Sequence, residues 1–467
     1  MISHAYKSLF LKMDSSLRYA LGTRVWQALS SCILLLLILK GTQPSEQGIY
    51  YTVASLANLQ IFFELGLSFV ILQSTPHYFQ TLTWGPRGTL LGPESGLATL
   101  LAFVQKSIRI YVVLAGLFLL TMLPLGLVFF RVKHDFHGVM LPVAWALLVF
   151  GMALNLLCSP WLAVLEGSGK VSEVYRLRLK QLVVANILAW MVFFLTNALF
   201  IIVVNTWITA LTSVGWLLST HRPFLRIVAG AMFKRLSFSW HKEIWPMQWR
   251  IAVSWISGYF LNQIFTPVLY YYKGAVVSGQ MGICLSLAMM LGLFAITWVT
   301  VRSPKMGALV AQADRKKLDQ VFFVAFWQSI FIFILGALSI LGIGFVLRDH
   351  AIMTRFLPWS EMALLLLGYF FVHIIGGLSL YLRAHRIELF MPLSVIGAVL
   401  IATSAWFGAV YYGSLGVVWS ILIVNACYGF PSAWLLWFKF KQKWRDNNGQ
   451  RDNESKTYNQ YSNLEPS

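Results

Sequence analysis

Residues 24–73 read RVWQALSSCILLLLILKGTQPSEQGIYYTVASLANLQIFFELGLSFVILQ, and the architecture of the whole chain can be predicted outward from them. With the three preceding residues, 21–23, they form two apolar runs, each long enough to cross a bilayer. The runs are joined by a short loop that contains the turn residues Gly41, Pro44 and Gly48. This pattern predicts a transmembrane helical hairpin.

Each run of the hairpin carries one charged residue, Arg24 in the first and Glu64 in the second. A charge near the centre of a spanning helix costs about 2.5–3.5 kcal/mol on insertion scales. Such residues usually face the interior of a helix bundle or a water-filled cavity. Arg24 and Glu64 are therefore the first candidates for function.

The composition assigns the chain to the polytopic helical membrane proteins. Of its 467 residues 58% are hydrophobic and 11% are charged, whereas roughly 25% of residues are charged in soluble domains. The net charge of +19 lies in short segments between apolar runs, so we expect no nucleic-acid partner. The first 20 residues lack an apolar core, so we expect no cleavable signal peptide.

We predict an all-α membrane fold of about twelve transmembrane helices in two six-helix bundles related by a parallel pseudo-repeat. The expected spans are 21–40, 51–73, 108–130, 138–165, 178–196, 198–218, 246–271, 276–301, 320–347, 358–382, 387–411 and 414–438.

The distribution of basic residues predicts the orientation. If both termini are cytoplasmic, only six of the 36 Lys and Arg residues fall in outer loops, and the other 30 fall on the cytoplasmic side. This bias is what the positive-inside rule requires. The longest inner segment, 74–107, carries turn residues around Gly85-Pro86 and Gly92-Pro93.

Five regions follow from these spans. Residues 1–20 are an N-terminal interfacial segment, and 21–221 form the first six-helix bundle. Residues 222–245 are a basic, aromatic, amphipathic linker on the cytoplasmic side. The second six-helix bundle spans 246–440, and 441–467 form a polar tail that we expect to be disordered.

A faint internal duplication supports the two-bundle arrangement. Lys40-Gly41, followed by Gly48, recurs as Lys273-Gly274, followed by Gly279. Transporters often place their substrate site at the interface between such repeats.

Polar side chains form stripes on three of the predicted helices. They are Arg24, Gln27 and Ser31 on the first; Gln60, Glu64 and Ser68 on the second; and Arg250, Ser254 and Ser257 on the seventh, with Trp255, Tyr259 and Asn262 beside them. Such stripes either line a cavity or join helices by hydrogen bonds.

Each charged member of these stripes allows two interpretations. Glu64 either couples transport to an ion or forms a structural ion pair with Arg24. Arg24 and Arg250 either extend toward the headgroups from inner helix ends or hold a pyrophosphate between them. His373 in the tenth span is a proton relay or, more simply, a hydrogen-bonded structural residue. Pro267 is expected to kink the seventh span.

The chain lacks the motifs of several enzyme classes. It has no Walker A sequence, no Gly-rich dinucleotide loop and no HExxH motif. The four cysteines are spread over separate apolar runs and form neither a metal motif nor a disulfide framework. We therefore expect no catalytic residues, no metal site and no cofactor.

Two groups of motifs resemble bacterial polysaccharide and O-antigen flippases of the multidrug/oligosaccharidyl-lipid/polysaccharide exporter superfamily. They are Gln47-Gly48-Ile49-Tyr50-Tyr51 with the stretch 59–67, and Ser254-Trp255-Ile256-Ser257-Gly258-Tyr259-Phe260 with the stretches 279–282 and 381–385. The resemblance implies two six-helix bundles around a central cavity that works by alternating access. In the polysaccharide branch it implies a cationic cavity for lipid-linked sugar pyrophosphates, which Arg24 and Arg250 match.

Three functions remain open. The first is a flippase that moves an undecaprenyl-pyrophosphate-linked oligosaccharide across the bacterial cytoplasmic membrane for surface polysaccharide or lipopolysaccharide synthesis. Its partners would be the lipid-linked oligosaccharide, membrane lipids and a polysaccharide polymerase complex, and its site residues Arg24, Gln27, Gln60, Glu64, Arg250, Tyr259 and Asn262. The second is an ion-coupled multidrug exporter that uses Glu64. The third is a membrane polysaccharide polymerase or ligase, against which the short predicted outer loops argue.

Overall fold

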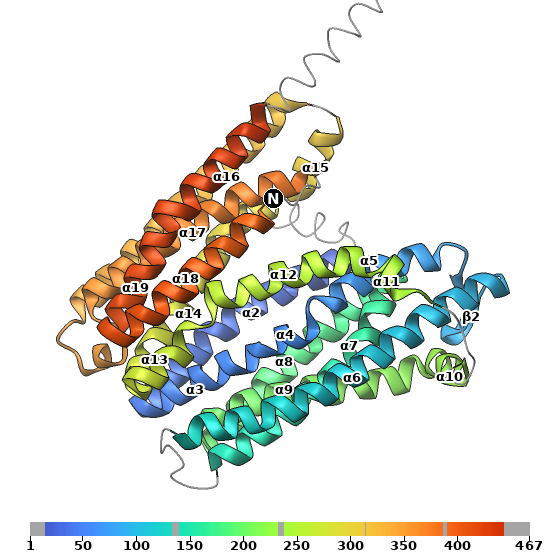
Figure 1. Ribbon diagram of the computed structural model, residues 1–467, viewed down its shortest axis with the longest axis horizontal. Helices are drawn as coiled ribbons and strands as arrows, with labels where there is room; N and C mark the ends of the chain where they lie inside the picture. The colour runs from blue at the N-terminus through green and yellow to red at the C-terminus, as the bar shows by residue number, and fades with distance from the viewer. Residues whose placement is uncertain (1–14, 133–139, 232–237, 313, 386–389, 443–467) are drawn as a thin grey trace, which may run out of the picture. The chain divides into compact units, whose positions relative to one another are not determined.

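The computed structural model describes residues 15–132, 140–231, 238–312, 314–385 and 390–442, and these are almost entirely helical (Figure 1). Ten of the described helices are long and apolar enough to cross a membrane, or eleven if one bent pair counts as a single span. The predicted all-α polytopic fold is confirmed. The chain divides into two compact units, Met1–Gly279 and Gln280–Ser467, and each is described by itself.

The first described helix of the first unit is α2 (Ser15–Gly41), and a long bent span follows it. Its further helices pack in the pairs α6–α7, α8–α9, α7–α9 and α2–α8. The elements of this unit are α3 (Pro44–Ala57), η1 (Asn58–Gln60), α4 (Ile61–Glu64), α5 (Leu67–Phe79), α6 (Glu94–Val132), α7 (Met140–Gly167), α8 (Val171–Leu195), α9 (Leu199–Thr220), α10 (Arg222–Ala231), α11 (Trp240–Glu243), α12 (Trp245–Asn262), α13 (Phe265–Lys273) and the start of α14 (Ala275–Thr300).

The second unit contains the rest of α14 and the helices that follow it. These are α15 (Ser303–Ala311), α16 (Arg315–Val346), η3 (Ala351–Arg355), α17 (Trp359–Ala384), α18 (Met391–Tyr412) and α19 (Ser414–Ile423). A π-helical turn, Val424–Gly429, interrupts the last span, which continues as helix to Gln442. A π-turn is rare in helices and is often found at functional sites.

The core of the first unit is packed around large aromatic side chains. Trp145 on α7 is buried, and its indole Nε1 donates to the carbonyl oxygen of Met122 on α6 over 3.0 Å. A Cβ atom at Gly126 would lie 2.0 Å from the Trp145 ring. The small residue therefore gives α6 room for the indole.

The start of α14 crosses α3 at the glycines of the sequence duplication. A Cβ atom at Gly48 would lie 1.8 Å from the carbonyl oxygen of Ala275, and one at Gly279 would lie 2.8 Å from the nitrogen of Gly48. The Gln47 side-chain amide donates to the carbonyl oxygen of Gly279 over 2.8 Å. The two glycine signals of the repeat thus meet in a single helix crossing.

Two predicted spans differ from the expected continuous helices. The second is divided into α3, η1, α4 and α5, with a bend of 41° at Leu65-Gly66. The seventh is divided into α12 and α13 at residues 263–264. Pro267 lies in the first turn of α13, where the lack of an amide proton carries little cost.

The long segment after the second span also differs from the prediction. Helix α6 begins at Glu94 instead of residue 108, so it extends well beyond the expected span. The turn residues around Gly85-Pro86 form a hairpin between β1 (Thr83–Trp84) and β2 (Leu90–Leu91). The turn was predicted correctly, but the polar segment 105–107 just before the expected span concealed the continuity of α6.

The five predicted regions map onto the units as follows. The linker begins as α10, and part of it, residues 232–237, lies outside the described residues, as do most of the N-terminal segment and the tail. The compact units divide between Gly279 and Gln280, so α12 and α13 group with the first unit. A division into six-helix bundles at 222–245 stays a prediction.

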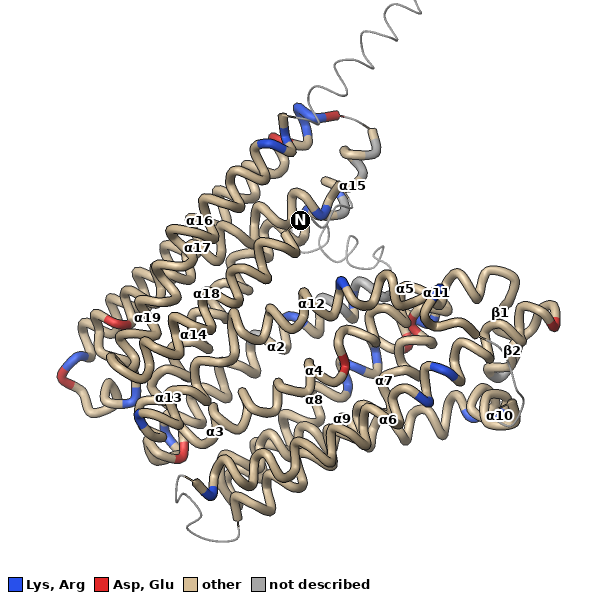
Figure 2. Tube along the Cα trace, viewed as in Figure 1, with Lys and Arg blue, Asp and Glu red and all other residues tan. Residues whose placement is uncertain are grey.

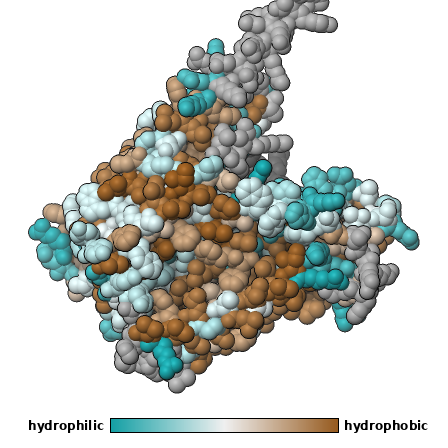
Figure 3. Space-filling model, viewed as in Figure 1, coloured by the Kyte–Doolittle hydropathy of each residue, from teal (hydrophilic) through white to brown (hydrophobic). Residues whose placement is uncertain are grey.

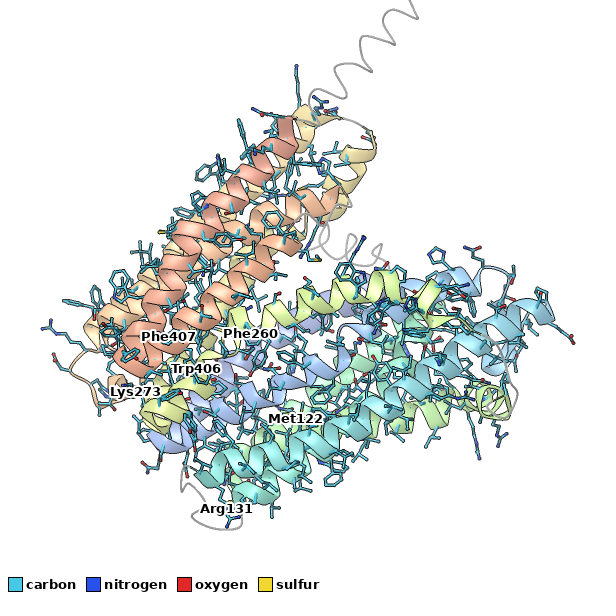
Figure 4. The ribbon with its side chains drawn as sticks, viewed as in Figure 1. Met122, Arg131, Phe260, Lys273, Trp406 and Phe407 are labelled. Atoms are coloured by element: carbon cyan, nitrogen blue, oxygen red, sulfur yellow. The ribbon has the colours of Figure 1, made fainter. Side chains whose placement is uncertain are left out.

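Charges and apolar side chains are separated along the helices. The Lys, Arg, Asp and Glu residues gather mainly toward helix ends and connecting segments (Figure 2). Exposed hydrophobic side chains cover much of the helix sides (Figure 3). Arg131 and Lys273, both predicted in outer loops, lie at the same end of the first unit (Figure 4). The side of the membrane on which that end lies stays a prediction.

Candidate functional site

The break in the second span determines where Glu64 lies. Glu64 is the last residue of α4, and the next two residues, Leu65 and Gly66, both have left-handed backbone conformations with φ of 50° and 67°. A positive φ is unusual for leucine. Broken helices inside membrane proteins occur where they are buried in protein or line a cavity, so the break marks Glu64 as a candidate.

The seventh span packs against this break. A Cβ atom at Gly66 would lie 2.5 Å from Cγ2 of Ile251 and 3.3 Å from the ring of Trp255, both on α12. Gly66 therefore satisfies two requirements at once, because it adopts the left-handed conformation and leaves room for α12.

The carboxylate of Glu64 is held by a tyrosine from the third span. The Tyr111 hydroxyl donates to Glu64 Oε1 over 3.1 Å, and Tyr111 on α6 is buried. The Phe63 ring contacts Phe118 edge-on, one residue before Glu64. Glu64 thus has a fixed neutral donor beside it.

The alternative of an ion pair between Glu64 and Arg24 is not observed. Within the described residues no ion pair joins these two side chains, and Arg24 is exposed and donates to Gln27 Oε1 over 3.4 Å. Arg24 and Gln27 thus lie together on α2, as their spacing predicted.

Arg250 occupies an exposed position on α12. Its guanidinium lies over the ring of Trp249, 5.6 Å from the centroid. In the described part of the chain, neither Arg24 nor Arg250 has a carboxylate within 4.0 Å. Both guanidiniums thus keep their charge available to an anion.

The remaining predicted residues lie where the two broken spans meet. Phe62 contacts Tyr259 edge-on, with centroids 5.3 Å apart, and also contacts Phe260. Tyr259 is buried, whereas Gln60 and Asn262 are partly exposed. The Asn262 amide donates to the carbonyl oxygen of Gly258 on its own helix over 3.0 Å.

Three polar residues at this junction were not predicted. The Ser55 hydroxyl donates to the carbonyl oxygen of Gln263, and the Asn58 amide donates to Gln263 Oε1 over 3.2 Å. Gln263 lies in the break between α12 and α13, so its carbonyl would otherwise lack a helical partner. Ser55 and Asn58 belong to an ordinary apolar run, and only the break gives them significance.

A second polar cluster lies at the opposite end of the first unit from Lys273, where α7 meets α8. His221 is 2% exposed, and its Nε2 lies 3.4 Å from Glu173 Oε2. The rings of Trp216 and Trp84 contact its imidazole, with centroids 4.5 and 6.4 Å away. Burial lowers the pKa of His221, and the charge of Glu173 offsets part of this effect.

Polar contacts in the second unit surround His373 and Asp319. His373 Nε2 lies 2.8 Å from the Ser329 hydroxyl, which itself donates to the carbonyl oxygen of Ala295, so the histidine joins neighbouring helices. Asp319 lies 2.7 Å from Lys441 Nζ and accepts a hydrogen bond from the Tyr381 hydroxyl over 3.0 Å. The hydrogen-bonded interpretation of His373 agrees with this geometry.

Comparisons with known proteins place the fold. No family model and no curated protein matches the chain. Two solved structures are similar over most of its length. One, described as the lipid II flippase MurJ in an inward closed conformation, has a TM-score of 0.58 and 15% identity, covering 91% of this chain and 87% of that one. The other is an inward-facing multidrug resistance MATE family transporter of the MOP superfamily. It has a TM-score of 0.51 and 14% identity, and the match covers 89% of this chain and 99% of that one. The chain shares the fold of these transporters.

Proposed function

We propose that the protein is a flippase that moves a lipid-linked oligosaccharide across the bacterial cytoplasmic membrane by alternating access. The substrate would carry an undecaprenyl pyrophosphate and serve surface polysaccharide or lipopolysaccharide synthesis, with a polymerase complex as downstream partner. Support comes from a fold shared with a lipid flippase and with drug exporters, together with two exposed guanidiniums that lack carboxylate partners in the described chain.

The guanidiniums of Arg24 and Arg250 carry this proposal. A guanidinium binds phosphate oxygens through two parallel hydrogen bonds and cannot lose its charge at physiological pH. Gln27 shares a face of α2 with Arg24 and would contact the first sugar or the phosphate. Tyr259, Asn262 and Gln60 would contact sugars farther along the substrate.

The test is translocation by the full-length protein in proteoliposomes. An undecaprenyl-pyrophosphate oligosaccharide is incorporated, and its appearance in the outer leaflet is measured by its accessibility to an added glycosidase. We expect Arg24→Gln and Arg250→Gln each to lower the rate by at least tenfold, because each removes a charged contact worth about 1.5–3 kcal/mol. The matched control is Arg226→Gln, an exposed arginine on α10. Equal rates in all four proteins would refute the assignment.

A second candidate function is supported by Glu64. A carboxylate beside a buried hydroxyl donor in a membrane span is suited to binding a proton or a cationic compound. An ion-coupled exporter of cationic drugs would use it. Expression in an exporter-deficient host tests this alternative, since drug resistance that is gained with the natural chain and lost with Glu64→Gln would favour the exporter over the flippase.

A further inference from the structure

The first turns of α8 carry positive charge that is not fully neutralised. Arg178 forms a close ion pair with Glu166, with Arg178 Nη2 2.8 Å from Glu166 Oε2. Arg176 and Lys180 lie on another side of the helix and have no carboxylate within 4.0 Å among the described residues. The remaining charge therefore belongs to one face of α8.

Helix α2 adds to this charge. Arg176 Nε donates to the Tyr19 hydroxyl over 3.1 Å, and the guanidinium lies 5.7 Å from the centre of the Tyr19 ring. Arg176 lowers the pKa of Tyr19 through this hydrogen bond, and the nearby charges of Arg18 and Lys180 act in the same direction. Tyr19 precedes the apolar span that begins at Gly22. The two helices thus create a positive potential at the level where the apolar span starts.

The two helices are direct and parallel neighbours. A Cβ atom at Gly22 would lie 3.3 Å from Cδ2 of Leu179. Farther along both helices, the rings of Trp26 and Trp190 are 6.2 Å apart. Contacts thus continue from the charged end into the apolar part of both helices.

An exposed apolar stripe follows the cations on each helix. On α8 the residues Arg176, Lys180, Val184, Ile187 and Met191 share one face by their spacing, and the last three are exposed. One face of α2 likewise carries Arg18 followed by Val25, Leu29 and Leu36, and these three apolar side chains are exposed. Each helix therefore presents a basic group followed by a strip of hydrocarbon.

We propose that the α2–α8 seam, formed by Arg18, Tyr19, Arg176 and Lys180, binds the headgroup of an anionic phospholipid whose acyl chains lie along the two apolar stripes. Basic pockets between membrane helices are suited to phospholipid headgroups. The phosphate accepts hydrogen bonds from Arg176 and Lys180, and Tyr19 donates from the interface, where tyrosine is favoured. The seam is separate from the proposed substrate residues, because Arg24 lies on a different face of α2, about 120° from Arg18.

The test is native mass spectrometry of the delipidated full-length protein titrated with phosphatidylglycerol. We expect Arg176→Gln combined with Lys180→Gln to weaken binding about 30-fold, as the loss of two interfacial cations predicts. The matched control combines Arg222→Gln with Arg226→Gln, two exposed arginines on α10, and is expected to change binding by less than about threefold. Thermal unfolding of each variant shows that it is folded.

Two further arms identify the ligand. Phosphatidylethanolamine, which has no net charge, is expected to bind the natural chain at least tenfold more weakly than phosphatidylglycerol. Inorganic pyrophosphate at millimolar concentration is expected not to displace the bound lipid. Equal binding of both lipids, equal loss in the control, or displacement by pyrophosphate would each overturn the proposal, and the last would indicate a site for a soluble anion. None of these outcomes depends on translocation, so the proposed flippase activity is tested separately.

Discussion

Replacing Gly48 by alanine tests the helix crossing on which the first unit depends. The added Cβ would lie 1.8 Å from the carbonyl oxygen of Ala275, whereas ordinary contact begins at 3.4 Å. The neighbouring backbone would have to retreat by roughly 1.6 Å, and over-packing of this kind costs about 1–3 kcal/mol. The retreat also stretches the Gln47–Gly279 hydrogen bond, 2.8 Å long, and such bonds in membrane proteins average about 0.6 kcal/mol.

We therefore expect Gly48→Ala to lower the free energy of unfolding by about 0.5–2.5 kcal/mol, after a gain of about 1 kcal/mol from the higher helix propensity of alanine. The assay is reversible unfolding in mixed detergent micelles. The control is Gly292→Ala, because Gly292 lies on α14 with nothing within 4 Å of its added Cβ, and we expect it to be neutral or slightly stabilising. If the two variants unfolded with the same free energy, the close crossing would be refuted.

Three other experiments test the polar contacts. Tyr111→Phe should cost about 1.5–3 kcal/mol of unfolding free energy, because it removes the donor to Glu64; an unchanged unfolding curve would contradict that hydrogen bond. Because the pKa of His221 is lowered in the folded protein, the unfolded chain takes up a proton at a higher pH than the folded chain does. The contribution of His221 to stability should therefore be constant above about pH 6.5 and should fall as the pH drops below it. In thermal unfolding at pH 5.5 and 7.5, His221→Gln should flatten this pH dependence, and an equal slope in both proteins would exclude His221 as its source. A double-mutant cycle with Asp319→Asn and Lys441→Met should give a coupling free energy of about 0.5–1 kcal/mol, because both side chains are partly exposed. A coupling free energy of zero would show that this ion pair contributes nothing to stability.

The long apolar runs made the spanning helices predictable. The ends of α7 and α9, and those of the apolar span Gly22–Gly41 within α2, lie close to the ends expected, because a run of apolar residues bounded by turns leaves few alternatives. The start of α6 was missed because Gln105, Lys106 and Arg109 interrupt its apolar sequence around the start of the expected span. Hydropathy alone does not distinguish a helix that extends beyond the bilayer from a loop.

The charged candidates were visible in the sequence, but their partners were not. Glu64 was conspicuous as a carboxylate in an apolar run, whereas Tyr111 reads like any aromatic residue of a membrane helix and is 47 positions away. The left-handed Leu65 has no sequence signal, because leucine rarely adopts that conformation. Ile251 and Trp255 of α12 lie against Gly66 at the break, and such tertiary contacts are not encoded in local spacing.

The grouping of α12 and α13 with the first unit has a consequence for experiments on fragments. A polypeptide that ended before Trp245 would retain the six predicted spans before the linker. It would lose Ile251 and Trp255, which pack at Gly66, and Gln263, which accepts hydrogen bonds from Ser55 and Asn58. The Ser55 hydroxyl and the Asn58 amide would then lose these hydrogen-bond acceptors inside the membrane, where an unsatisfied polar group is costly.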